Sequence, residues 1–153
     1  MSAVRLATVE DIDELVRMRW DFSQEENPQH SVDYREFYPV CSAFLQKALT
    51  SGDWYIWIAE KDDRIVSNMY LQLIHKVPRP GAFQNPYYAY VTNVYTRPDY
   101  RSQGIGTAIH RALEQWAQEN HVEFLILWPS EKSGVFYARN GFSRSREALE
   151  KHF

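Results

Sequence analysis

The clearest pattern of hydrophobic positions in the chain lies between residues 104 and 119. Apolar side chains recur there three or four positions apart, which is the spacing of one face of an α-helix. The members of this stripe are Ile105, Ala108, Ile109, Ala112, Leu113, Trp116 and Ala117. We therefore expect a long amphipathic helix over 104–119. The β-branched and aromatic residues directly before it predict a strand over 87–96.

A second apolar stretch follows this helix and predicts another strand. Residues 123–128 are continuously apolar at their centre, Phe124-Leu125-Ile126-Leu127. Such a run is typical of a strand that is covered on both faces and parallel to its neighbour. Strand, helix and strand together predict one right-handed βαβ unit. Beyond it, Ser130 can cap a short helix that ends at Asn140-Gly141, and residues 142–153 could add one more strand or short helix.

The first half of the chain predicts a simpler alternation of helices and strands. Apolar and β-branched runs bounded by turn residues predict strands over 3–7, 54–59 and 65–74. Helical spacing predicts one helix over about 8–20 and another within 33–50. We expect the second helix to start near Pro39, because proline lacks an N–H and clashes with the preceding turn. The aperiodic stretches 21–31 and 75–86 are expected to be loops.

Composition narrows the class of protein. The 153 residues suit one domain, 1–153, and 44% hydrophobic with 24% charged residues is typical of a globular protein. The net charge of −3 argues against nucleic-acid binding, which depends on basic patches. The single cysteine, Cys41, excludes an internal disulfide and gives no metal cluster. Without an apolar signal segment or a membrane-spanning run, we expect a cytoplasmic protein with no membrane partner.

The turn between the strand over 87–96 and the long helix carries two glycines, Gly104 and Gly106. The first N–H groups of a helix lack intrahelical partners and favour an anion such as phosphate, which glycine lets approach closely. Arg101 adds a cation suited to phosphate oxygens. Neither the P-loop motif nor the dinucleotide fingerprint fits, since the chain has no Gly-Lys-Ser/Thr here and Ile109 replaces a small residue. A plain turn from strand to helix stays the alternative.

Two motifs in this half of the chain resemble those of one enzyme family. Arg101-Ser102-Gln103-Gly104-Ile105-Gly106 is similar to the Q/R-x-x-G-x-G/A signature of the GNAT N-acetyltransferases. The stretch from Ser133 to Phe142 resembles the family's ending A-x-x-F-Y-x-x-x-G-F, with Ser133 where alanine is common and Ser130 where asparagine is common. The two motifs stand in the family's order, about 30 residues apart around an apolar strand, so their joint match is more specific than either alone.

This resemblance implies the GNAT-like acyl-CoA N-acyltransferase fold, an α/β fold with a mixed, mostly antiparallel central sheet flanked by helices. A parallel pair of strands in it diverges around acetyl-CoA, whose acetyl group passes directly to a primary amine without a metal. The residues that it places on acetyl-CoA are Val94, Tyr95, Thr96, Arg101, Ser102, Gln103, Gly104, Ile105, Gly106, Thr107, Ser130 and Ser133. Tyr137 stands where the family's tyrosine protonates the departing sulfur, and core packing is the alternative for it.

The sequence leaves the acceptor and the general base open. Acidic and aromatic residues early in the chain give a weak indication of a cationic, partly apolar amine, small or peptidic: Trp20, Phe22, Glu25, Glu26, Tyr34 and Tyr38. We expect this amine to enter between the loops over 21–31 and 75–86. The candidates for the general base are His75, Glu25, Glu26 and Asp99. A non-catalytic acyl-CoA-binding or regulatory module on the same fold is the alternative function, and a homodimer is left open.

Overall fold

The computed structural model describes residues 2–153, and Met1 lies outside the described part. The helices are α1 (Ile12–Glu26), α2 (Tyr34–Ser51), α3 (Ile105–Glu119) and α4 (Gly134–Arg139). The strands are β1 (Ala3–Leu6), β2 (Trp54–Lys61), β3 (Arg64–His75), β4 (Tyr87–Thr96) and β5 (Val122–Ile126). Two short 3₁₀ turns, η1 (Val9–Asp11) and η2 (Pro98–Tyr100), lie before α1 and α3.

The five strands form one sheet in the order β1-β2-β3-β4-β5. The pairs from β1 to β4 are antiparallel, while β5 runs parallel to β4. A parallel pair needs a crossover connection, and α3 supplies it. This is the mixed, mostly antiparallel α/β sheet that the sequence predicts, and the two strands of the predicted βαβ unit are neighbours in it.

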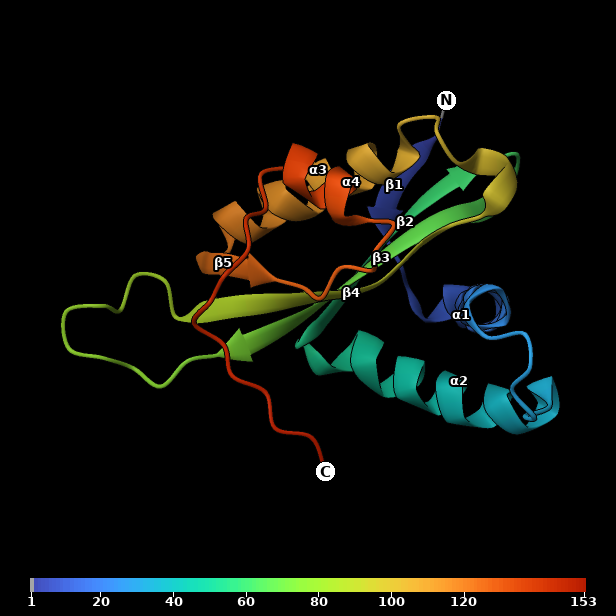
Figure 1. Cartoon of the computed structure of the whole chain (residues 1–153), viewed down its shortest axis with the longest axis horizontal. Helices are drawn as coiled ribbons and strands as arrows, with labels where there is room; N and C mark the ends of the chain where they lie inside the picture. Colours follow the sequence, from blue (N-terminus) through green and yellow to red (C-terminus); the bar gives the residue numbers. More distant parts are fainter. Residues whose placement is uncertain (1) are drawn as a thin grey trace.

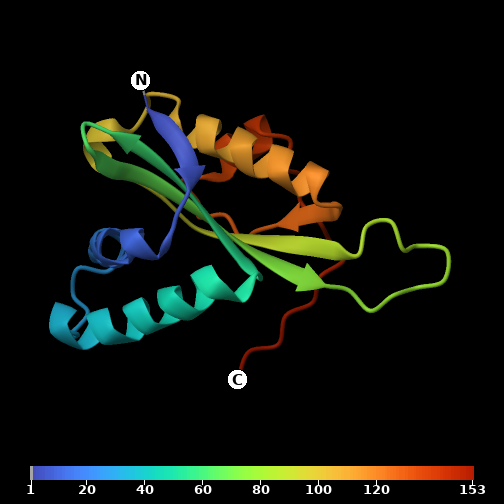
Figure 2. The same cartoon turned by 180° about the vertical axis from the view of Figure 1, so that it is seen from behind.

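Helices cover both faces of the sheet, with α1 and α2 on one face and α3 and α4 on the other (Figures 1 and 2). The alternation of side chains along β2 shows how one strand serves both layers. Ile56 and Ile58 pack in the core beneath α1 and α2, whereas Trp57 and Ala59 pack in the core beneath α3. Successive residues of a strand point to opposite faces, so one apolar run closes two cores.

Helix α1 is longer than the sequence predicts. It runs to Glu26, through residues that read as a loop. Its last turns have no apolar stripe in the sequence. They are helical because tertiary contacts to β4 and to the turn after β4 hold them in place. Phe22 stacks on Tyr95 of β4 with ring centroids 5.0 Å apart. The Asp21 carboxylate accepts a hydrogen bond from Arg97 at 3.2 Å. The predicted loop over 21–31 is therefore wrong for its first half.

Helix α2 also starts earlier than expected, at Tyr34, with Pro39 inside it. The Asp33 carboxylate caps the helix by accepting a hydrogen bond from the amide of Arg35 at 2.9 Å. Pro39 lies in the second turn and is exposed, so water can satisfy the carbonyl that it leaves without an amide partner. A strong cap thus outweighs the cost of the proline, and the prediction of a start near Pro39 is wrong.

Strand β5 is shorter and more exposed than its apolar sequence predicts. It spans Val122–Ile126 instead of 123–128, and Phe124 is 48% exposed. The reason is that β5 lies at the edge of the sheet, where α3 packs on one of its faces, whereas α1 and α2, on the opposite face of the sheet, pack on other strands. Phe124 stacks on Tyr88 of β4, with 5.1 Å between the ring centroids. The prediction of a strand covered on both faces is wrong, while the parallel direction is confirmed.

The C-terminal residues 142–153 form neither a strand nor a helix. They run back past the end of β5, where the indole N–H of Trp128 donates a hydrogen bond to Glu150 at 2.6 Å. The end of the chain is therefore held by side-chain contacts. No helix within residues 2–153 combines the length and apolarity needed to cross a membrane.

Candidate active site

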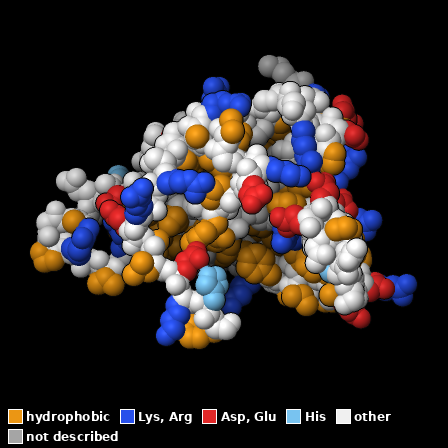
Figure 3. Space-filling model, in the orientation of Figure 1, with side chains coloured by type: hydrophobic (Ala, Val, Ile, Leu, Met, Phe, Trp, Pro, Cys, Tyr) orange, Lys and Arg blue, Asp and Glu red, His pale blue; other side chains and the backbone are white. Residues whose placement is uncertain are grey.

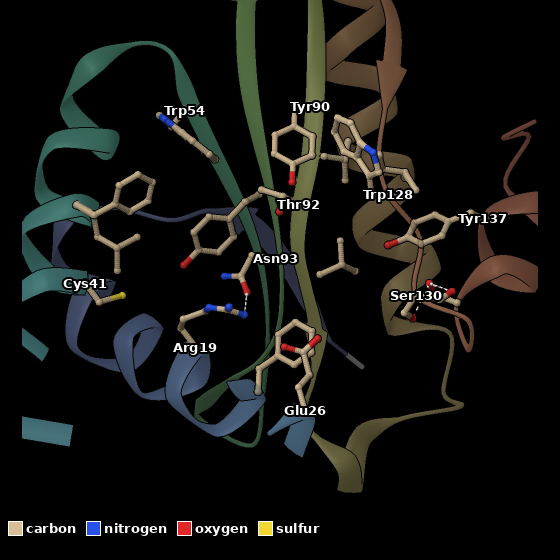
Figure 4. Close-up of a pocket in the computed structure, with 18 of the residues that line it drawn as sticks. Arg19, Glu26, Cys41, Trp54, Tyr90, Thr92, Asn93, Trp128, Ser130 and Tyr137 are labelled. Carbon is tan, nitrogen blue, oxygen red and sulfur yellow. Dashed lines mark hydrogen bonds between the residues drawn. The ribbon is translucent and has the colours of Figure 1, made fainter. Parts of the chain in front are cut away.

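A bulge in β4 shapes the centre of the site. β4 has two residues, Asn93 and Val94, at the point where β3 has one. Asn93 has a left-handed φ of +48°, a conformation that asparagine tolerates better than most residues. The side-chain amide of Asn68 donates a hydrogen bond to the Asn93 carbonyl at 2.7 Å and holds the bulge in place. Residues of the bulge are thereby presented to the space beside the sheet (Figure 4).

β4 and β5 diverge on the way to this bulge. Their pairing ends at Tyr90 and Ile126, and beyond these residues the two strands separate. A cavity of about 700 Å³ fills the gap and continues beneath α1 and α2. The surface shows a hollow there, with apolar side chains gathered around it (Figure 3). The divergence of the parallel pair, which the family resemblance implies, is therefore confirmed.

Tyr137 lies on α4 and points its hydroxyl into this cavity (Figure 4). The residue is only 8% exposed, and its ring packs edge-on against Phe136 and Phe142. The backbone fixes this arrangement, because the amide of Phe142 bonds back to the Tyr137 carbonyl at 3.0 Å. Burial raises the pKa of the Tyr137 phenol to about 12. The hydroxyl therefore stays protonated at neutral pH and can act as a donor inside the cavity.

Two serines line the cavity between β5 and α4. The Ser130 hydroxyl donates to the Ser133 hydroxyl at 2.9 Å, and that hydroxyl donates to the Ser130 carbonyl at 3.1 Å. Ser130 and Ser133 lie in the turn before α4, and both line the cavity beside which the family resemblance places acetyl-CoA. Each hydroxyl keeps acceptor capacity toward the cavity, because a hydroxyl oxygen has two lone pairs.

The glycine loop ends at the start of α3. Gly104 caps this helix with a left-handed φ of +77°, and a Cβ placed on it would meet no atom of the protein within 4 Å. The space in front of the helix is therefore open. The amide groups of Ile105, Gly106 and Thr107 belong to the first turn, where a helix has no internal acceptors for them. Such donors in open space fit the pyrophosphate of coenzyme A.

The side chain of Arg101 is bound to other parts of the protein. Its Nε donates to the Thr96 carbonyl at 2.8 Å, and its Nη2 donates to the Glu25 carboxylate at 2.7 Å. The Tyr95 hydroxyl donates to the same carboxylate at 2.6 Å. Burial alone would raise the pKa of Glu25, but the hydrogen bonds from Tyr95 and Arg101 lower it. This cluster, Glu25–Tyr95–Arg101, ties the end of α1 to β4 and the glycine loop.

Two more residues of the predicted set use their side chains within the protein. The Thr96 hydroxyl bonds to Ser67 at 2.7 Å. The Gln103 side chain donates to the Asp99 carbonyl at 3.2 Å and accepts from Lys61 at 2.8 Å. The groups of the loop that stay available to an anion are therefore its backbone N–H groups.

The other half of the cavity comes from residues that the sequence motifs do not mark. α1 contributes Arg19, Phe22 and Glu26, α2 contributes Phe37, Val40, Cys41, Phe44 and Leu45, and β2 and β3 contribute Trp54 and Tyr70. Their signal in the sequence is only the aromatic excess of the chain. Among residues 2–153, no cluster of histidine, cysteine and acidic side chains is arranged to hold a metal ion.

Several early candidates lie elsewhere. Three of the aromatic candidates do not line the cavity: Trp20, Tyr34 and Tyr38 pack between α1 and α2. The loop over 75–86 projects away from the body of the protein and lines no part of the cavity (Figure 1). His75, at its base, faces Asp53 at 3.5 Å. The predicted entry of the acceptor between the loops 21–31 and 75–86 is therefore wrong, because the two do not border one space.

The sequence of residues 12–142 matches the model of the acetyltransferase (GNAT) family. Because this match spans most of the chain, the protein belongs to the GNAT acetyltransferase family, as its two motifs indicate. Members of this family use acetyl-CoA. No protein of curated function gives a significant sequence match to the chain.

Solved structures share the fold over nearly the whole chain. A predicted acetyltransferase from Clostridium acetobutylicum, solved with acetyl-CoA, has a TM-score of 0.84 at 26% identity and covers 99% of this chain and 96% of its own. A GCN5-related N-acetyltransferase from Ralstonia eutropha JMP134 has a TM-score of 0.76 at 23% sequence identity, and the match covers 99% of each chain. An aminoglycoside acetyltransferase from an uncultured soil metagenomic sample, in complex with sisomicin, has a TM-score of 0.72 at 17% sequence identity. That match covers 99% of this chain and 94% of the acetyltransferase.

Proposed function

We propose that the protein is an N-acetyltransferase that moves the acetyl group of acetyl-CoA directly to a primary amine. One observation supports this above all others. A single cavity joins the gap between β4 and β5 to the space beneath α1 and α2, and the Tyr137 hydroxyl points into it. A cofactor entering from the gap and an acceptor entering from the helices would meet beside the bulge of β4.

The residues of the cofactor side have separate tasks in this proposal. The amides at the start of α3, from Ile105 to Thr107, bind the pyrophosphate, with Arg101 and Gln103 shaping the loop around it. Backbone groups of the stretch 94–96 and the hydroxyls of Ser130 and Ser133 hold the pantetheine arm. Acetyl-CoA supplies a thioester carbonyl, whose oxygen gains negative charge during transfer and needs fixed donors beside it. Tyr137 donates its proton toward the departing sulfur.

The acceptor must lose a proton as it becomes acylated. Among the described residues that line the cavity, Glu26 is the one carboxylate, and no histidine lines it. Glu26 can accept that proton directly or through water, so of the four residues considered from the sequence it is the one that we retain as the base. Glu25 is unsuited to this task, because it is bound to Tyr95 and Arg101.

Direct transfer is favoured over an acetylated enzyme. Cys41 is the one thiol of the chain and lines the cavity. Burial raises the pKa of this thiol, so it is protonated at neutral pH and a poor nucleophile. The acetyl group therefore has no activated side chain to occupy on its way to the amine.

The test is to incubate the protein with acetyl-CoA and a panel of amines while measuring free thiol and the mass of each product. We expect one acetylated amine per thiol released, and no acetyl adduct on the intact protein. Thiol release that stays unchanged by every amine, together with tight acetyl-CoA binding, would support a non-catalytic binding module instead. A stable adduct that Cys41→Ala removes would contradict direct transfer.

A further inference from the structure

One cation faces the acceptor half of the cavity. Arg19 extends from α1 toward the bulge of β4 (Figure 4), and its Nη1 donates a hydrogen bond to the Asn93 side-chain oxygen at 3.2 Å. The guanidinium carbon lies 5.3 Å from the centre of the Phe22 ring. Within residues 2–153, Arg19 forms no ion pair with a carboxylate. Its charge is therefore balanced only by an amide oxygen and an aromatic face.

Two carboxylates that follow Arg19 on α1 are committed to other arginines. Asp21 pairs with Arg97 at 3.2 Å and lies 3.6 Å from Arg17. Glu25 pairs with Arg101 at 2.7 Å. Asp21 and Glu25 therefore neutralise other arginines. Neither of them balances the charge of Arg19, which faces the cavity. A partly buried cation without a counter-ion is costly, and an anionic group of a ligand would relieve that cost.

The surroundings of Arg19 are apolar and aromatic. The wall beside it is formed by Phe22, Phe37, Phe44, Leu45, Trp54 and Tyr70. Burial raises the pKa of the Tyr70 phenol, so Tyr70 adds no charge. Glu26 also lines the cavity and is exposed to solvent. A ligand here meets a large apolar surface with one fixed cation at its inner end, next to the bulge.

We infer that the acceptor is an α-amino acid with a large apolar side chain, such as phenylalanine or leucine. This inference rests on the proposed function, which places the reacting amine beside the bulge at Asn93. Arg19 is hydrogen-bonded to Asn93, so a carboxylate bound by Arg19 lies close to that amine, as in an α-amino acid. The apolar side chain then fills the aromatic wall. The new C–N bond forms as the C–S bond breaks; the amine loses one proton and the sulfur gains one.

The test compares acceptors that differ only in the carboxylate. L-Phenylalanine is set against phenethylamine, and L-leucine against isoamylamine, with thiol release as the readout. We expect kcat/KM to be about 100-fold higher for each amino acid, because a guanidinium binds a carboxylate through two charge-assisted hydrogen bonds. Arg19→Met should remove that preference by raising KM for the amino acids about 100-fold, while phenethylamine changes by about threefold or less.

Arg17→Met is the matched control. Arg17 lies on the same helix, but its side chain is exposed and packs over Tyr34 outside the cavity. The same substitution there should leave both acceptors unchanged. If Arg19→Met does not fold, the substrate pairs with the wild-type protein decide the question alone.

The remaining outcomes overturn the inference in distinguishable ways. Equal or faster acetylation of phenethylamine would exclude a carboxylate site and leave the proposed function standing. Preference for a diamine such as putrescine would show that Glu26, and not Arg19, selects the acceptor. Absence of thiol release with every amine would overturn the proposed function, and this inference with it.

Discussion

Replacing Tyr137 with phenylalanine isolates the one proton donor that α4 presents to the cavity. The substitution keeps the ring that packs against Phe136 and Phe142. Within residues 2–153 the hydroxyl has no hydrogen-bond partner on the protein that it would leave unsatisfied. We therefore expect the Tyr137→Phe protein to unfold at the wild-type temperature and to bind acetyl-CoA with unchanged affinity.

The structure sets the size of the catalytic effect. A phenol of pKa about 12 is a weaker acid than a thiol of about 8.5. At 1.36 kcal/mol per pKa unit, full proton transfer would be uphill by roughly 5 kcal/mol, less if burial also weakens the thiol. Tyr137 then acts mainly by donating a hydrogen bond to the sulfur as it becomes negative. Such a bond contributes about 1.5–3 kcal/mol, so kcat should fall by about 10- to 150-fold.

The assay is steady-state thiol release at saturating acetyl-CoA and acceptor, with Tyr88→Phe as the control. Tyr88 is on β4 but stacks on Phe124 outside the cavity, so its loss should leave kcat unchanged. The raised pKa adds a pH test. Because Tyr137 stays protonated up to about pH 12, the wild-type kcat should show no loss from its ionisation between pH 7 and 10. A wild-type kcat in Tyr137→Phe would refute the donor role.

Two further predictions concern the cofactor loop and stability. Gly104→Ala should weaken acetyl-CoA binding at least tenfold, which is about 1.4 kcal/mol by calorimetry. Gly52→Ala at the end of α2 is the control, because Gly52 has the same left-handed backbone and the same open space, and its affinity for acetyl-CoA should not change. Equal affinities of the two variants for acetyl-CoA would contradict the loop assignment. The bidentate hydrogen bonds from Arg5 lower the pKa of Asp11 in spite of its burial, so its contribution to stability is present above pH about 4 and lost as pH falls further. Asp11→Asn should therefore lower the free energy of unfolding by about 1 kcal/mol at pH 7. In thermal unfolding this difference should shrink as pH falls below about 4, and a difference that stays constant with pH would refute the assignment.

The cofactor half of the site was predictable because its signals are local. A strand, a glycine turn and an amphipathic helix follow one another along the chain, and the helix stripe from Ile105 to Ala117 fixes which side of α3 is buried. Backbone donors at a helix start need no partner from elsewhere in the sequence. The short helix with Tyr137 is likewise bounded by its own turn residues. Local order in the sequence was enough to place these elements.

The acceptor half was not predictable, because its residues come together only through tertiary packing. Arg19 lies within the predicted helix, but its spacing does not show that it faces a cavity. Phe22 lies beyond the predicted end of that helix, on turns of α1 whose helical extent depends on contacts with β4, such as the stacking of Phe22 on Tyr95. The pairing of Glu25 with Arg101 joins residues 76 positions apart. Neither feature leaves a period or motif in the sequence. The edge position of β5, which exposes Phe124, depends in the same way on the whole sheet.

The walls of the cavity divide the chain into two consecutive parts. Every lining residue supplied by α1, α2, β2 and β3 lies at or before Tyr70, and every other lining residue lies at or after Tyr90. The proposed cofactor machinery is confined to the second part. Selection for a different acceptor could therefore act on the first seventy residues while the second part stays fixed. A chimera joined in the projecting loop between β3 and β4 would exchange one specificity for another in a single recombination event, with the junction far from either wall.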